Sequence, residues 1–294
     1  MLAAIAEAID VGRRGGLRVN ISHVKALGVD VHGQAGEVVR VIRAARDEGL
    51  AVTADQYPWT ASSTGLSAAL LPRWAEAGGR DSLLARLEDP EIRNRIAAEM
   101  RENLRRRGGA ASLLLTGVSG SDSALRRRAA GRTLEAFAAA EGADPVEAAI
   151  TIIHAGGASV ASFNMTEADI ETLMVEPFVM TGSDGSGGHP RKYATYPRKI
   201  RRYVLDKPVI TMTRMIQASS AQVADAFGIR ERGRLCVGCF ADVIVFDPAT
   251  IRDVATYTEP TLLAEGMRWV LVNGVPVVAD GALTGELAGR ALQR

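Results

Sequence analysis

The stretch LRVNISHVKALGVDVHGQAGEVVRVIRAARDEGLAVTAD (residues 17–55) decides the fold class. Residues 17–22 form a short, β-rich run, and residues 50–55 repeat that character. Residues 35–49 between them predict a helix, because apolar side chains recur at helical spacing and a glycine follows. The apolar positions are Val38, Val39, Ile42 and Ala45. A strand, a helix and a second strand in this order indicate a βαβ unit, and therefore a parallel sheet in an α/β fold.

Elements on both sides continue this pattern. An amphipathic helix is expected before residue 17, and a charged helical segment at residues 80–108 is expected to be an excursion from the barrel or sheet. Helices are also predicted to begin at Thr133, at Asp144-Pro145 and at Thr166, where Asp169 would complete a capping box. The remaining expected elements are strands at 112–118, 158–164 and 177–184, and two helices over 211–227.

The texture of the chain changes near residue 232. Short apolar runs alternate with glycines there, and Asn273-Gly274 and Asp280-Gly281 are typical of hairpin turns. We therefore predict an α/β body over residues 1–231 and a small β module over residues 232–294.

Composition narrows the class of partner. The 294 residues are 47% hydrophobic and 23% charged, with a formal net charge of +1, which indicates an ordinary globular chain. This charge balance gives no reason to expect nucleic acid or an anionic membrane as a partner. No apolar run is long enough to span a bilayer, and the first residues lack the pattern of a secretory signal. A small molecule or a protein is the expected partner.

The two cysteines, Cys236 and Cys239, form a C-x-x-C pair. A redox pair or half of a zinc site is one interpretation, but zinc needs four ligands and there is no second pair. We expect packed thiols at a strand end. The lack of any disulfide framework predicts a reducing, cytoplasmic location.

Polar side chains follow several of the expected parallel strands. They are His23, Asp55 with Tyr57, the serines of 119–121, and Asp184. Active sites of parallel α/β folds form at the carboxyl ends of the strands, where the loops converge. This pattern predicts an active site at that edge.

Each of these residues also has a plainer interpretation. Asp184 in GSDG is equally typical of a turn, His23 of a buried and satisfied side chain, and Arg191 of the surface. Together they fit one hydrolytic task, in which an imidazole holds a metal, a carboxylate moves a proton and a guanidinium binds a substrate carboxylate.

Long motifs in this chain resemble those of one family. They are NISHVKALG (20–28), TADQYPWTASST (53–64), VASFNMTEADI (160–170), VMTGSDG (179–185), HPRKYATYPR (189–198), GCFADVIVFDP (238–248) and VNGVPV (272–277). In this order they resemble the C-terminal part of the D-aminoacylases, or N-acyl-D-amino-acid deacylases, of the zinc amidohydrolase superfamily.

The resemblance implies a fold. That family has a (β/α)₈ barrel and a small β-sandwich built from both chain ends, so this chain would supply barrel strands five to eight and half of the sandwich. The family's opening strands, its H-x-H motif and its metal-binding cysteine would lie upstream of the matched residues.

The resemblance also implies an activity, which is hydrolysis of an N-acyl-D-amino acid to a carboxylate and a free D-amino acid by a zinc-activated water. It implies that His23 is a ligand of one or two zinc ions, that Asp184 is the general acid/base, and that Arg191 binds the substrate's α-carboxylate. Tyr57 stands where the family has a further histidine ligand, so it is either a ligand or a hydrogen-bond donor to substrate. Lys25 is either a second substrate-binding cation or a solvated lysine.

Two other functions stay open. One is an amidohydrolase acting on another linear or cyclic amide. The other is a half-barrel that is inactive unless it meets a partner, either a complementary N-terminal half or a second copy, because half a barrel leaves sheet edges unpaired. His189 lies two residues from Arg191 and so close to the expected site, and the plainer interpretation is that it only shapes its loop.

Overall fold

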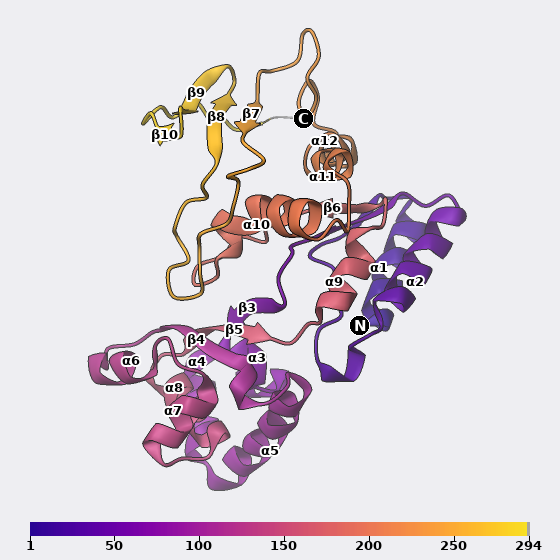
Figure 1. The fold of residues 1–294 in the computed structure, drawn as a ribbon. Coiled ribbons are helices and arrows are strands. Elements are labelled where there is room, and N and C mark those ends of the chain that lie inside the picture. The colour runs from indigo at the N-terminus through magenta and orange to yellow at the C-terminus, as the bar shows by residue number, and fades with distance from the viewer. Residues whose placement is uncertain (293–294) are drawn as a thin grey trace.

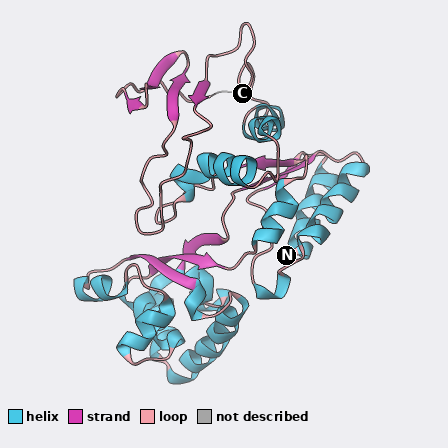
Figure 2. Cartoon of the chain, in the orientation of Figure 1, coloured by secondary structure: helices cyan, strands magenta, loops and turns pink. Residues whose placement is uncertain are grey.

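The computed structural model describes residues 1–292 and divides into three regions (Figure 1). The first region combines helices with a small sheet, helices predominate in the second, and the third consists of strands joined by long loops (Figure 2). The elements of the first region are α1 (Leu2–Gly15), β1 (Val19–Ile21), the short turn η1 (Val29–Val31), α2 (Ala35–Asp47), β2 (Val52–Gln56), α9 (Glu167–Met174), β6 (Val179–Thr181), α10 (Arg191–Ile200), the π-helical turn η4 (Arg201–Asp206), α11 (Met212–Ser219) and α12 (Ala221–Phe227).

The predicted βαβ unit is confirmed. β1 and β2 pair in parallel with Val19 opposite Val52, and β2 pairs in parallel with β6, which gives the order β1-β2-β6. The apolar faces of α1 and α2 pack with the sheet and with α9 in one core. This core includes Ile5, Ile9, Val38, Ile42, Val52, Ala54, Leu173, Phe178 and Val179. Burial of the apolar stripe that the sequence predicted therefore fixes α2 on the sheet.

A large insertion separates β2 from β6. Its elements are β3 (Ala61–Gly65), α3 (Leu66–Leu70), η2 (Arg73–Glu76), α4 (Gly79–Glu88), α5 (Pro90–Arg106), η3 (Ala110–Ser112), β4 (Leu113–Val118), α6 (Ser123–Ala129), α7 (Leu134–Glu141), α8 (Pro145–Ala155) and β5 (Ala158–Phe163). It forms a separate lobe below the first region in Figure 1, with its own core beneath its sheet.

The insertion corrects one part of the sequence interpretation. Strand 112–118 was expected to extend the parallel sheet, but β4 pairs antiparallel with β5 in a separate sheet of order β3-β5-β4. An apolar run such as LLLTGV suits a buried parallel strand and an antiparallel strand with one covered face equally well, so periodicity cannot distinguish them. The described parallel sheet therefore has three strands instead of four, and residues 119–121 do not lie at its edge.

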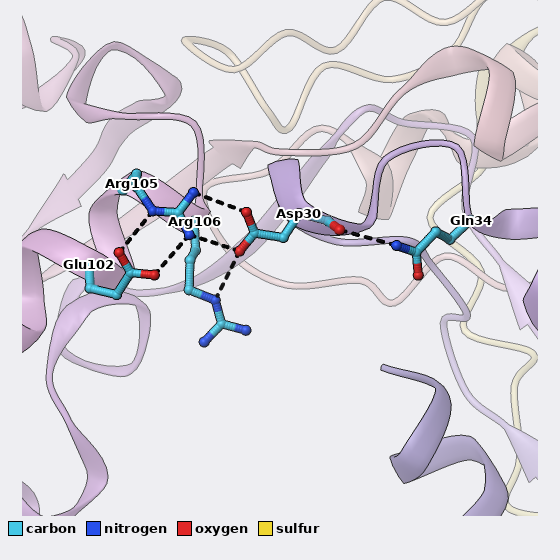
Figure 3. A network of polar contacts seen from close by, with 5 residues as sticks. All are labelled: Asp30, Gln34, Glu102, Arg105 and Arg106. Atoms are coloured by element: carbon cyan, nitrogen blue, oxygen red, sulfur yellow. Dashed lines mark hydrogen bonds and ion pairs between the residues drawn. The ribbon is translucent and has the colours of Figure 1, made fainter.

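Ion pairs join the insertion to the first region. Arg105 of α5 donates from Nη1 and Nη2 to both carboxylate oxygens of Asp30 in η1, at 3.0 and 2.9 Å, and Arg106 lies 3.5 Å from the same carboxylate (Figure 3). Glu102 holds Arg105 from the other side. Because these side chains are half exposed, we expect the pairs to orient the insertion more than to stabilise the chain.

The third region is an antiparallel sheet of order β10-β9-β8-β7, formed by β7 (Val243–Phe246), β8 (Met267–Val272), β9 (Val275–Ala279) and β10 (Ala282–Leu283). Asn273 and Asp280 both take positive φ, 52° and 48°, before their glycines, so the two predicted turns are confirmed. The expectation of packed thiols is wrong, because Cys236 and Cys239 form a disulfide in the loop before β7. Thiols three residues apart in an exposed loop lie close enough to bond.

The described helices are all too short or too polar to cross a membrane.

Candidate active site

The carboxyl ends of the three parallel strands bring the predicted site residues together. His23 follows β1, Tyr57 follows β2, and Asp184 follows β6. Two cations lie near the Tyr57 ring, with the Lys25 Nζ 5.3 Å and the Arg191 Cζ 4.6 Å from its centroid. Thus side chains from 23 to 191 in the sequence share one edge of the sheet, as parallel strands require.

Two of these residues have unusual backbone conformations. His23 has φ 42° and Asp184 has φ 43°, in the left-handed region that non-glycine residues rarely adopt. Each such residue costs about 1–2 kcal/mol. Strain of this kind persists only where surrounding contacts impose it, and it is frequent at functional sites.

Asp184 and Arg191 form an ion pair. The Arg191 Nη2 lies 2.9 Å from the Asp184 Oδ2, and it also donates to the Ser186 Oγ at 3.0 Å. The Arg191 side chain is 2% exposed, whereas that of Asp184 is 34% exposed. A substrate carboxylate would therefore compete with Asp184 for the Nη2 of this guanidinium.

Tyr57 carries an unused donor. Its hydroxyl is buried and has no hydrogen-bond partner among the described residues, and the same is true of the Arg191 Nε. Burial raises the pKa of the Tyr57 phenol well above its usual value. The unpartnered hydroxyl leaves Tyr57 able to donate a hydrogen bond to a bound molecule.

Lys25 lies beside His23, the predicted zinc ligand. Its Nζ is 2.7 Å from the His23 Nδ1. Burial, together with the positive charge of Arg191, lowers the pKa of Lys25 to about 8, although Asp184 and Asp55 oppose this shift. Lys25 is therefore not the fully solvated lysine of the alternative interpretation.

The donor set does not by itself fit zinc. A zinc site takes three or four protein ligands, and the described residues contain no group of three histidine, cysteine, aspartate or glutamate side chains suitable for a metal. When the Lys25 ammonium donates to the His23 Nδ1, the neutral imidazole keeps its proton on Nε2, so neither nitrogen has a free lone pair. His23 is at most one ligand of an incomplete set.

His189 does more than shape a loop. Its Nδ1 accepts a hydrogen bond from the Arg191 backbone N–H at 3.1 Å, which assigns the proton to Nε2, and Nε2 donates to the Ala61 carbonyl at 3.1 Å. Burial and the charge of Arg191 lower the pKa of His189 to about 3. A neutral His189 thus holds the start of α10, and with it Arg191, against the beginning of the insertion.

Aromatic residues that the sequence analysis did not single out surround His189. The Trp59 and Tyr257 rings lie 5.4 and 5.0 Å from the imidazole, and Phe163 lies 4.9 Å from Tyr257. Tyr257 comes from the long loop between β7 and β8, which reaches down to the insertion in Figure 1. No local pattern marks Tyr257, because its role depends on contacts distant in the sequence.

Comparison with known proteins gives a consistent result. A model described as the amidohydrolase family matches residues 15–278. D-aminoacylase from Alcaligenes xylosoxydans xylosoxydans is 31% identical over 302 residues, which cover 100% of this chain and 52% of that protein. N-acyl-D-glutamate deacylase from the same organism is also 31% identical, over 99% of this chain and 51% of its own length. The chain spans about half the length of these curated relatives.

Solved structures agree. A crystal structure of D-aminoacylase superposes with a TM-score of 0.78 at 30% identity, covering 100% of this chain and 53% of its own. N-acyl-D-glutamate deacylase from Bordetella bronchiseptica, solved with zinc and a phosphonate inhibitor that mimics the tetrahedral intermediate, gives a TM-score of 0.74 at 30% identity, over 95% of this chain and 51% of its own.

Proposed function

Because this chain belongs to the amidohydrolase family, we propose that it carries the proton-transfer and substrate-orienting part of a site that hydrolyses N-acyl-D-amino acids. The relatives named D-aminoacylase and N-acyl-D-glutamate deacylase support this substrate class. The observation that carries the proposal is the exposed Asp184 carboxylate paired with a buried Arg191, beside the unused donor of Tyr57. The products would be a carboxylate and a free D-amino acid.

The ion pair suggests how substrate binding prepares Asp184. The α-carboxylate of an N-acyl amino acid has the same chemistry as the Asp184 side chain, so it competes for the Arg191 guanidinium. Once displaced, Asp184 is free to accept a proton from the attacking water and to deliver it to the leaving amine. Tyr57 and Lys25 would donate hydrogen bonds to the substrate's oxygens.

Zinc is part of the proposal, but the described residues do not provide a complete set of zinc ligands. When bound, zinc polarises an amide carbonyl and lowers the pKa of a water to about 7. His23 would have to release Lys25 to become a ligand, and the other ligands would come from outside the described residues.

We also propose that the three parallel strands are the C-terminal part of an eight-stranded barrel, and that β7–β10 are part of a β-sandwich. The domain boundary at residues 231 and 232 stays a prediction. So does the cytoplasmic location, but the Cys236–Cys239 disulfide removes the observation on which it rested. β1 and β6 are the edges of the described parallel sheet, so a complementary segment or a second copy could pair there.

The test is release of free amino acid from matched N-acetyl-D- and N-acetyl-L-amino acids, with zinc added and with the D184N variant as the control. D-selective release that D184N abolishes would support the proposal. Equal release from both enantiomers would contradict the substrate class. A folded but inert chain would favour the partner-dependent alternative, which the incomplete donor set and the two sheet edges also favour.

A further inference from the structure

Asp55 is the charged residue that links the ends of all three parallel strands. It lies in β2, the central strand, one residue before that strand ends. Its side chain contacts the neighbouring strand ends on both sides. His23 and Asp184 follow those two ends, so a shift of Asp55 would move both site residues.

The first contact is with His23. The Asp55 Oδ1 accepts a hydrogen bond from the His23 backbone N–H at 2.9 Å, and the Asp55 backbone carbonyl accepts one from the Val24 N–H at 2.8 Å. These two bonds fix the peptide groups on both sides of the His23 Cα. They account for the left-handed backbone of His23.

The second contact holds the carboxylate in place. The Asn20 Nδ2 donates to the Asp55 Oδ2 at 2.8 Å, and the Asn20 Oδ1 accepts from the Thr53 Oγ1 at 3.0 Å. Both oxygens of Asp55 therefore already have partners within this chain. This arrangement suits a side chain that holds others in position, and it leaves proton transfer to Asp184.

The third contact is with the end of β6. A Cβ added to Gly182 would lie 2.6 Å from the Asp55 Oδ1, which is closer than real Cβ atoms approach a neighbour. The backbone of Gly182 is not in the left-handed region. Glycine is therefore favoured there because a larger residue would collide with Asp55, and not because of the φ angle. The Asp55 carboxylate thus fills the space that a side chain at position 182, two residues before Asp184, would occupy.

We infer that Asp55 is a positioning residue, which fixes the left-handed backbone of His23 and sets the spacing between His23 and the Asp184 loop. The part of this inference that concerns catalysis rests on the proposed function. The part that concerns His23 does not.

The experiment compares D55A, D55N and G182A in the full chain, with D47N, an exposed carboxylate at the end of α2, as the matched control. Hydrogen exchange at the His23 amide reports the first contact directly. We expect exchange to accelerate about tenfold or more in D55A, the effect of losing one charge-assisted hydrogen bond. D55N keeps an acceptor for this amide and should stay within about threefold of the wild type.

Kinetics test the second part. With an N-acetyl-D-amino acid, D55A and G182A should lower kcat about tenfold or more while changing KM less than about threefold, and D55N should restore most of kcat. Combining D55A with G182A should add little, because alanine removes the atom that the new Cβ meets.

Unchanged exchange at the His23 amide in D55A would overturn the inference. A D55N variant no better than D55A would also overturn it. So would a kcat equal to the wild type's in D55A or in G182A. If D55A does not fold, the kcat of G182A decides, and a value equal to the wild type's overturns the inference. If the wild type releases no amino acid, the proposed function fails, while the exchange measurement still decides the role of Asp55.

Discussion

Lys199 in α10 is a buried cation without an anionic partner, and its replacement should stabilise the protein. The side chain is 1% exposed, its Nζ donates to the Thr181 Oγ1 at 2.9 Å, and no carboxylate of the described residues forms an ion pair with it. Burial, and then the nearby charge of Arg214, lowers the pKa of Lys199 from 10.5 to about 7. We expect K199M to fill the same volume without the buried amine, while the Thr181 Oγ1 keeps its bond from the Ser219 Oγ.

The size of the effect follows from linkage. The unfolded chain binds the proton below pH 10.5, whereas the folded chain binds it only below about 7. The free energy of unfolding of the wild type therefore decreases as the pH falls from 10.5 to about 7. Below pH 7 it stays at this lower value. At 1.36 kcal/mol per pKa unit, the loss amounts to about 5 kcal/mol.

Urea unfolding at pH 7 and pH 10 measures this prediction. K199M should exceed the wild type in free energy of unfolding by up to about 5 kcal/mol at pH 7, and most of that advantage should disappear at pH 10. K192M, an exposed lysine of the same helix, should show no such pH dependence. An advantage of K199M that is equal at both pH values would refute the reasoning.

Three further predictions concern the candidate site. D184N should lower kcat by a factor of about 10²–10⁴ in a chain that still folds, with a lower Tm because the buried Arg191 loses its anionic partner, and undiminished turnover would remove Asp184 from its role. R191A should raise KM for N-acetyl-D-amino acids about tenfold or more, but not for the corresponding carboxamides; an equal rise for both would contradict the carboxylate contact. Y57F removes a buried hydroxyl without a partner, so its Tm should equal or exceed that of the wild type while kcat/KM falls; a lower Tm would show that the hydroxyl is bonded in the folded protein.

The sequence predicted the parts of the fold that depend on local pattern. The βαβ unit, the buried stripe of α2 and the turns at Asn273 and Asp280 all follow from periodicity or from backbone preference. The antiparallel pairing of β4 with β5 did not follow, because strand direction is set by partners distant in the chain.

The candidate site shows the same division. Strand ends brought His23, Tyr57 and Asp184 together, as the sequence predicted. The pairing of Asp184 with Arg191 and the approach of Tyr257 could not be predicted, since each depends on tertiary geometry that no spacing in the sequence encodes.

The insertion between β2 and β6 has a consequence for folding kinetics. Ala54 pairs with Val179, so these adjacent strands are 179 − 54 = 125 residues apart in the chain. The two ends of the insertion meet where the Met165 N–H donates to the Thr60 carbonyl at 3.1 Å, and the insertion has its own core. If it folds first, the loop that β6 must close shortens to about 20 residues, which lowers the closure entropy by about 1.5 kcal/mol. We therefore expect the insertion to fold before the parallel sheet. The pairing of β2 with β6 then needs only a short loop to close, and it should be faster than the closure of the full loop.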